Sequence, residues 1–154
     1  MALSLEQAIS NIDQLILQLE FQIPRIATEL SIGVKSNIQD RIQERGVDSN
    51  GKALPPYSEP YAKFRDKNKL QTDHVDLTFS RGGIGMWSKT GVIGVQKGKK
   101  FLVTVGGQDQ ETKNKLGWNS DRYGDVLKPS KLEKNEAIEI FNFRIEKIVK
   151  DAFR

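Results

Sequence analysis

The stretch that decides the fold is residues 4–46, SLEQAISNIDQLILQLEFQIPRIATELSIGVKSNIQDRIQERG. Its apolar side chains recur at alternating spacings of four and three residues from Leu5 to Leu30, and then at spacings of four to Ile42. A stripe this regular predicts one long amphipathic helix over residues 4–44. The stripe consists of Leu5, Ile9, Ile12, Ile16, Leu19, Ile23, Ile26, Leu30, Val34, Ile38 and Ile42.

The sequence also predicts where this helix begins and ends. Ser4 and Gln7 have the spacing of a capping box, and Gly46 suits the left-handed conformation that ends many helices. Pro24 lacks a backbone donor, so we expect a kink or a tight break there. Two interpretations of the stripe stay open: all of it faces the core of its own domain, or part of it faces a neighbouring subunit.

A second amphipathic helix is predicted over residues 130–153. Pro129 precedes it, and Ser130 with Glu133 forms another capping box. Its apolar face comprises Leu132, Ala137, Ile138, Phe141, Ile145, Ile148, Val149 and Ala152. Residues 107–129 before it are polar, and we expect a short helix around Gln110–Leu116 followed by a loop.

Residues 75–106 read as β structure. Val75–Phe79 alternates as a strand does, and Gly91–Gln96 and Phe101–Val105 flank Lys97–Lys100 as the two arms of a hairpin. Between them lies the glycine-rich loop Arg81–Trp87. The sequence therefore predicts a single α+β domain over residues 1–154, in which long N-terminal and C-terminal helices pack on a small antiparallel sheet.

Residues 45–74 are predicted to be an irregular basic loop. Asn50-Gly51 is a turn signal, and three prolines follow within ten residues. Tyr57, Tyr61 and Phe64 alternate with lysines and arginines, an arrangement that can stack on nucleic-acid bases. The alternative is that these aromatic side chains fix the loop to the body of the domain while the cations stay in water.

The net charge of +4 is unevenly distributed along the 154 residues. Residues 1–44 carry three basic and six acidic side chains, residues 45–100 carry eleven and five, and residues 101–154 carry ten and nine. The basic excess thus belongs to the middle segment. Such a segment attracts either nucleic acid or an acidic protein surface, and the acidic N-terminal helix favours the second.

The sequence offers few candidate residues for a catalytic or metal site. The chain has no cysteine and one histidine, His74, which we expect to be exposed. A Mg²⁺-dependent nuclease would use Glu111 and Lys113 with Asp76 or Asp109. We expect no enzyme activity, no cofactor and no metal, and the lack of a long apolar run or a secretory signal predicts a protein folded in a cytoplasm and not in a membrane.

Several short motifs together resemble the phage virion morphogenesis, or tail completion, family. They are Asp48…Asn50-Gly51-Lys52…Leu54-x-Pro56-Tyr57-Ser58-x-x-Tyr61…Lys67, then Val75-Asp76-Leu77-Thr78 and Gly85-Met86, and finally Arg122-x-Gly124…Pro129-Ser130…Glu133. The resemblance implies a non-enzymatic virion protein that forms a ring at the head–tail junction and completes the tail for joining to the head. Other neck components, such as a tail terminator or a head–tail connector, are alternatives.

The resemblance also implies partners: copies of the chain itself, other neck, tail-tube or connector proteins, and packaged DNA nearby. We expect contacts through the glycine-rich loop, the hairpin turn and the aromatic segment. Trp87 and Met86 allow two interpretations, an exposed interaction element or a core anchor. The predicted interface residues are Tyr57, Tyr61, Arg81, Met86, Trp87, Lys97, Lys99 and Lys100.

Overall fold

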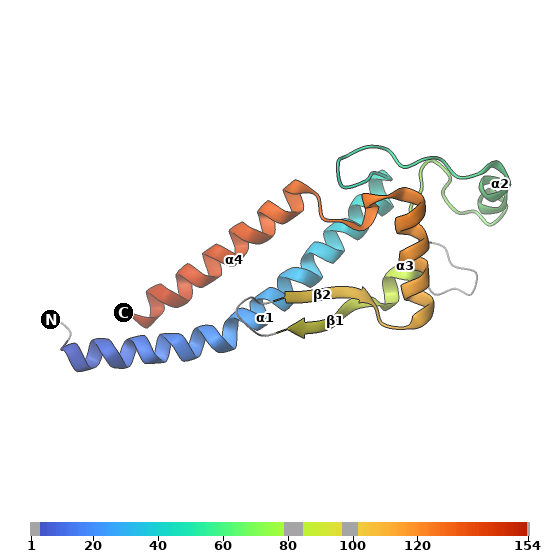
Figure 1. Ribbon diagram of the computed structural model, residues 1–154. Coiled ribbons are helices and arrows are strands. Elements are labelled where there is room, and N and C mark those ends of the chain that lie inside the picture. Colours follow the sequence, from blue (N-terminus) through green and yellow to red (C-terminus); the bar gives the residue numbers. More distant parts are fainter. Residues whose placement is uncertain (1–3, 79–84, 97–101, 154) are drawn as a thin grey trace.

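The structure is a computed structural model that describes residues 4–78, 85–96 and 102–153. Within these ranges the chain has four α-helices and one two-stranded antiparallel sheet, which confirms the α+β class (Figure 1). The elements are α1 (Leu5–Arg45), α2 (Glu59–Lys67), the 3₁₀ turn η1 (Met86–Lys89), β1 (Thr90–Gln96), β2 (Leu102–Gly107), α3 (Gln110–Tyr123), the 3₁₀ turn η2 (Asp125–Leu127) and α4 (Lys131–Ala152).

Both ends of α1 are fixed as the sequence predicts. The Ser4 hydroxyl accepts a hydrogen bond from the Gln7 backbone at 3.2 Å, and the Gln7 side chain accepts one from the Ser4 backbone at 3.0 Å. At the other end Gly46 has a φ of 59° and donates to the Ile42 carbonyl. A Cβ at Gly46 would lie 2.6 Å from the His74 Cβ, so glycine is required there for its φ and for its size.

Pro24 bends α1 without ending it. The helix runs unbroken from Leu5 to Arg45 with this proline inside it, and Figure 1 shows a bend within its blue N-terminal half. Proline lacks the donor for the bond back to Glu20, and its ring crowds the preceding turn, which bends a helix. The predicted kink is therefore the correct one of the two outcomes expected at Pro24.

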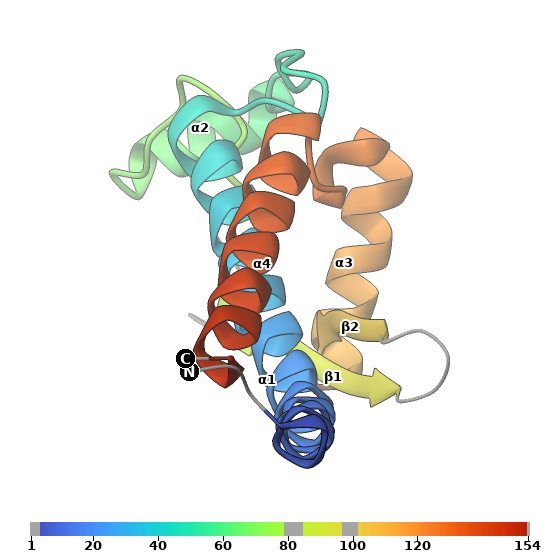
Figure 2. The same ribbon diagram turned by 90° about the vertical axis from the view of Figure 1, so that its left-hand side faces the viewer.

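α4 lies antiparallel along α1 (Figure 2). Its Ser130–Glu133 capping box is present. Two ion pairs set the register between the helices: Arg41 with Glu133 at 2.9 Å near the start of α4, and Glu29 with Arg144 at 2.5 Å further along. α4 thus accompanies the second half of α1 and ends beside the region before Pro24.

The hairpin is the whole of the described sheet. β1 pairs with β2 from Thr90 opposite Gly107 to Gln96 opposite Leu102, with a bulge between Val92 and Gly94. α1 packs against both strands, and α3 packs against β2. The predicted antiparallel pairing of the two arms is confirmed, and the predicted turn Lys97–Lys100 lies outside the described residues.

The predicted strand Val75–Phe79 is wrong over its described residues 75–78. The Asp76 carboxylate accepts a hydrogen bond from the Thr78 backbone at 3.0 Å, which closes a turn around Leu77. Leu77 has a φ of 53°, in the left-handed region that a strand cannot contain. Val75 is fully buried, so the alternation reflected packing of a loop instead of a sheet.

Two helices differ from the sequence-based expectation. The segment 45–74 contains α2, because Pro60 falls in its first turn, where a proline needs no donor. α3 extends to Tyr123 beyond the expected end at Leu116. Asp109 caps its start by accepting from the Thr112 backbone at 2.7 Å, a signal that the polar composition concealed.

The hydrophobic core gathers around the C-terminal part of α1. Its buried members are Ile38, Ile42, Leu54, Val75, Met86, Trp87 and Val126. They come from α1, η1, η2 and the loops between them. The apolar stripe of α1 therefore divides: its C-terminal part is core, and its N-terminal part extends away from the core (Figure 1).

Candidate functional site

The first half of α1 forms a projecting element, which we call the α1 arm (Leu5–Phe21). Six of its large apolar side chains are between 46% and 77% exposed: Leu5, Ile9, Ile12, Ile16, Leu17 and Phe21. Leu15 and Leu19 are half-buried. A helix of this length extends roughly 25 Å. Leu5, Ile9, Ile12 and Ile16 share one face of the helix, and a monomer that keeps this face in water has a surface suited to another protein.

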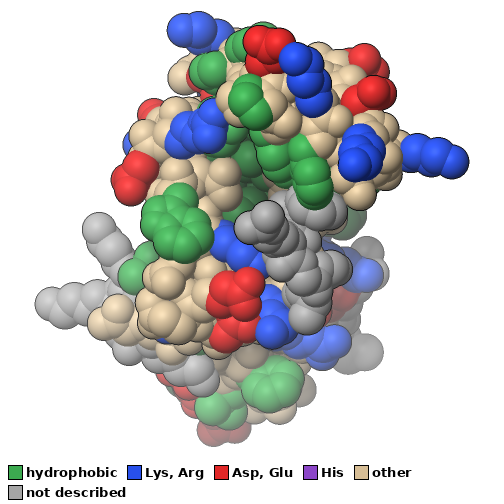
Figure 3. Space-filling view, turned by 90° about the vertical axis from the view of Figure 1, so that its right-hand side faces the viewer, with side chains coloured by type: hydrophobic (Ala, Val, Ile, Leu, Met, Phe, Trp, Pro, Cys, Tyr) green, Lys and Arg blue, Asp and Glu red, His purple; other side chains and the backbone are tan. Residues whose placement is uncertain are grey.

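A second feature lies between α2, η1 and α3, toward the opposite end of the molecule. It is a cleft of about 560 Å³, which we call the aromatic cleft. Its lining comprises Tyr57, Ser58, Tyr61, Arg65, Leu77, Met86, Lys115, Trp118, Asn119, Arg122 and Tyr123. The lining includes all three tyrosines of the chain. Figure 3 looks onto this end and shows hydrophobic side chains set among Lys, Arg, Asp and Glu side chains.

A buried polar network holds the wall of the aromatic cleft in place. The Asp76 carboxylate accepts hydrogen bonds from Arg65 at 2.6 Å, from Gln71 at 2.8 Å and from the Tyr57 hydroxyl at 2.8 Å. The Tyr57 hydroxyl also accepts from the Asp76 backbone at 2.9 Å. The Arg65 guanidinium lies 4.6 Å from the centre of the Tyr57 ring. These bonds fix α2 to the loop that follows it.

The network determines the titration of its members. Burial on its own would raise the pKa of the Asp76 carboxyl, but the hydrogen bonds donated by Thr78, Gln71 and Tyr57 lower it to about 2. Burial raises the pKa of the Tyr57 phenol, which therefore keeps its proton and remains a donor to Asp76. At neutral pH the Asp76 carboxylate is therefore charged and the Tyr57 phenol is neutral, and the hydrogen bond between them is kept.

We expect Asp76 to contribute an acid-dependent part of the stability. Its folded pKa of about 2 lies below the ordinary 3.8, so its contribution is complete above about pH 4 and is lost as the pH falls to about 2. The contribution is on the order of 2 kcal/mol. Urea unfolding between pH 6 and pH 2 measures it. Asp76→Asn should flatten this pH dependence by that amount, and an unchanged slope in the variant would refute the assignment.

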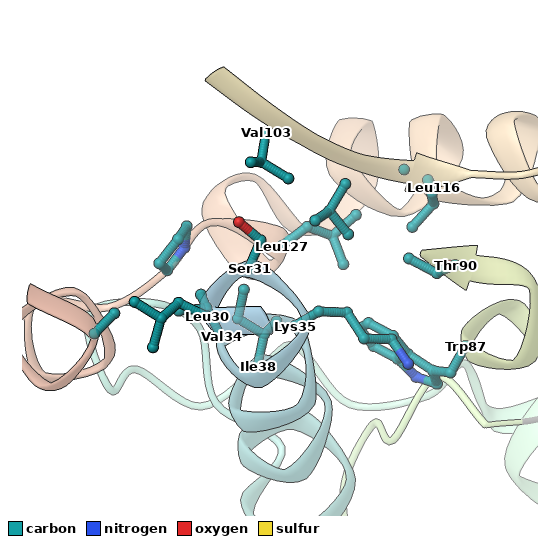
Figure 4. A pocket seen from close by; sticks show the side chains of 14 residues that line it. Leu30, Ser31, Val34, Lys35, Ile38, Trp87, Thr90, Val103, Leu116 and Leu127 are labelled. Atoms are coloured by element: carbon teal, nitrogen blue, oxygen red, sulfur yellow. The ribbon is translucent and has the colours of Figure 1, made fainter. Parts of the chain in front are cut away.

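An aliphatic pocket lies beneath the sheet, between α1, β2, α3 and α4. Its volume is about 360 Å³. Figure 4 shows Leu30, Val34 and Ile38 of α1 on one side and Val103 of β2 on the other. Lys35 extends along it, with its Nζ 5.9 Å from the centre of the Trp87 ring and 3.0 Å from Gln39. The pocket is a gap left where the hairpin meets α1.

The structure separates the predicted interface residues into three groups. Tyr57 and Tyr61 lie together in the aromatic cleft, with ring centres 5.1 Å apart. Met86 and Trp87 are 3% and 6% exposed, so of their two interpretations the core anchor is correct and the exposed interaction element is wrong. The remaining residues lie outside the described ranges: Arg81, Lys97, Lys99 and Lys100.

Sequence reasoning missed the α3 side of the cleft. Lys115, Trp118 and Arg122 recur at spacings of three and four, which places them on one helix face. This signal was hidden because the helix was expected to end at Leu116. Trp118 is 66% exposed, whereas the chain's other tryptophan, Trp87, is buried.

The three acidic residues considered for a nuclease site each form an ion pair with a basic side chain. Asp76 pairs with Arg65, Asp109 pairs with Lys89 at 2.7 Å, and Glu111 pairs with Lys115 at 2.5 Å. Among residues 4–78, 85–96 and 102–153, no three His, Asp or Glu side chains are grouped so that they could hold a metal ion. The nuclease alternative gains no support from this arrangement.

His74 is half-buried, not exposed as expected. Its Nε2 lies 2.7 Å from the Gln43 carbonyl near the end of α1. The ring packs against Gly46, where a Cβ would meet it. The imidazole thus helps to fix the loop after α2 on the end of α1.

In the same described ranges no helix has the length and hydropathy needed to cross a membrane.

No protein-family model, no curated protein and no solved structure matches this chain.

Proposed function

We propose that this chain is a non-enzymatic structural protein of a tailed-phage virion. In this role it forms an oligomeric ring at the head–tail junction and completes the tail for joining to the head. Its partners are copies of itself and adjacent neck, connector or tail-tube proteins. A tail terminator or a head–tail connector is the nearest alternative, since both are also ring-forming neck components.

The α1 arm is the observation that carries the assembly part of this proposal. Its apolar side chains would cost free energy to leave in water, and burying one leucine or isoleucine fully contributes about 1.5–3 kcal/mol. Ile9, Ile12 and Ile16 alone would therefore supply several kcal/mol to an interface. The apolar stripe of α1 begins in the core and extends beyond it into the arm. Such an extension suits a subunit that buries the arm against neighbouring subunits.

The segments that resemble the tail completion family support the virion part of the proposal. They do not form a catalytic arrangement. Asp48 accepts from the backbones of Asn50 and Lys52 in a turn, at 2.8 Å and 2.9 Å, and Tyr57 bonds Asp76. These contacts build the loop-and-helix unit that surrounds α2, so the resemblance rests on architecture, as expected for a structural protein.

The purified chain should form a discrete oligomer, and the α1 arm should be needed for it. Replacing both Ile12 and Ile16 by aspartate puts charges into the apolar stripe and should convert the oligomer to monomer. Light scattering coupled to size-exclusion chromatography measures the mass. Ser10→Asp is the matched control, because Ser10 is exposed on another side of the arm.

The virion role has its own test. A phage that lacks this gene should yield DNA-filled heads and separate finished tails in electron micrographs, and the wild-type gene should restore joining. The Ile12→Asp, Ile16→Asp variant should fail to restore it. Normal virions in the absence of the gene would refute the proposed function, as would a chain that stays monomeric at high concentration.

A further inference from the structure

We infer that the α1 arm of one copy docks in the aromatic cleft of the next copy. The inference rests on the proposed function only in assuming that the chain assembles with itself, and it names the two surfaces that meet. It commits to a second copy as the occupant of the cleft. The arguments come from position, charge and residue chemistry.

The two surfaces lie at opposite ends of the molecule. In Figure 1 the α1 arm extends to the left, and α2 and α3, which form the aromatic cleft, lie to the right. α1 runs without interruption from the arm to Arg45, so the arm cannot fold back onto its own cleft. Any contact between arm and cleft must therefore join two different copies.

The charges of the α1 arm disfavour pairing between two arms. Its acidic residues are Glu6, Asp13 and Glu20, each directly after a residue of the apolar stripe and seven apart. The arm contains no lysine or arginine. Two antiparallel arms would place these acids opposite one another, and parallel arms would offer them no opposite charge. The arm thus needs a partner surface that supplies cations.

The body of the chain supplies them. The arm holds three of the 20 acidic residues and none of the 24 basic ones, so every Lys and Arg lies beyond it. Lys115 and Arg122 line the aromatic cleft itself. Complementary charge steers association and selects the partner surface. The acids beside the stripe and the cations beside the cleft are therefore suited to meet.

The lining of the cleft has the chemistry of a protein-binding hot spot. Tyrosine, tryptophan and arginine are the residues that most often dominate binding energy at interfaces. The aromatic cleft combines Trp118 and Arg122 with the three tyrosines. Isoleucine and leucine side chains from an amphipathic helix fill such a groove at spacings of three and four residues.

The aliphatic pocket beneath the sheet is a weaker acceptor. Its one cation is Lys35, whereas both Lys115 and Arg122 line the aromatic cleft. It therefore offers apolar volume but little complement for the acids of the arm. An arm-to-cleft contact is also head-to-tail, which is the kind of interface that closes into a ring when the rotation per copy permits.

Cysteine trapping tests the contact directly, because the chain has no cysteine of its own. One variant carries Ile12→Cys in the arm, and another carries Ser58→Cys, which is exposed at the cleft and caps nothing with its side chain. Mixing the two under mild oxidation should give a covalent dimer at least tenfold above background. A chain with both substitutions should give a ladder of oligomers.

Matched variants distinguish the other outcomes. Ser10→Cys mixed with Ser58→Cys should remain at background, because Ser10 lies away from the apolar stripe. A dimer from Ile12→Cys alone would show arm–arm pairing, and a dimer with Val103→Cys would place the arm in the aliphatic pocket; either result overturns the inference. If the oligomer persists in light scattering with no arm-to-cleft product, the inference is wrong and the proposed function stands.

A second measurement removes the cleft chemistry without introducing a thiol. Trp118→Ala with Arg122→Gln should weaken self-association at least tenfold in sedimentation equilibrium while the circular dichroism of the chain stays unchanged. An unaltered oligomer would overturn the inference. So would binding of a 20-base-pair DNA duplex that these two substitutions abolish while the oligomer persists, because nucleic acid would then be the occupant.

Discussion

Replacing Arg41 by alanine is expected to lower the free energy of unfolding by about 3–5 kcal/mol. Arg41 is 4% exposed, and its guanidinium donates to Glu133 at 2.9 Å and to the carbonyls of Val47, Val126 and Lys128 at 2.8, 3.1 and 3.0 Å. Its loss would leave the buried Glu133 carboxylate without its cation, with only the Ser130 backbone N–H still donating to it. Chemical denaturation followed by circular dichroism measures the change.

Arg25→Ala is the matched control for Arg41. Arg25 lies on the same helix and also pairs with a glutamate, Glu29, at 3.1 Å, but its side chain is mostly in water. An exposed pair of this kind contributes at most about 1 kcal/mol. If the two arginine variants lost similar stability, Arg41 would not have the connecting role assigned to it.

Trp87→Ala is expected to cost about 3–5 kcal/mol of unfolding free energy. Trp87 is buried in the core cluster with Ile38 and Met86, and its removal leaves a cavity beside the existing aliphatic pocket. The neighbouring helix and sheet cannot collapse fully into that space. Thermal and guanidinium unfolding monitored by circular dichroism should both show the loss.

Trp118→Ala separates packing from assembly. Trp118 is largely exposed, so the monomer should lose less than about 1 kcal/mol on its removal. The two tryptophans thus have opposite expected effects: Trp87 acts on stability, and Trp118 acts on self-association. A large loss of stability in Trp118→Ala, measured on the monomeric Ile12→Asp, Ile16→Asp background, would contradict this division.

The helices were accessible to sequence reasoning because their signals are local. A stripe repeated over eleven positions and two capping boxes placed α1 and α4 within one or two residues of their observed ends. The hairpin was found for the same reason, since two β-rich runs flank a short polar turn. Such features depend on neighbours in the chain, and the surrounding fold does not alter them.

The errors share a different cause, which is long-range packing. Val75–Thr78 has the alternation of a strand, yet the bonds of Asp76 to Tyr57 and Arg65 across the chain make it a turn. Trp87 stayed undecided because the sequence does not show what covers a glycine-rich loop. The aromatic cleft likewise joins α2 to α3, and no local pattern indicates that they meet.

The bend at Pro24 has a geometric consequence for any head-to-tail assembly. When an arm is held by the next copy, the angle between arm and body and the orientation of the arm in the cleft together set the rotation that relates successive copies. A closed ring needs that rotation to divide a full turn by a whole number. One proline, by fixing a bend inside a single helix, would then help to determine how many subunits encircle the axis.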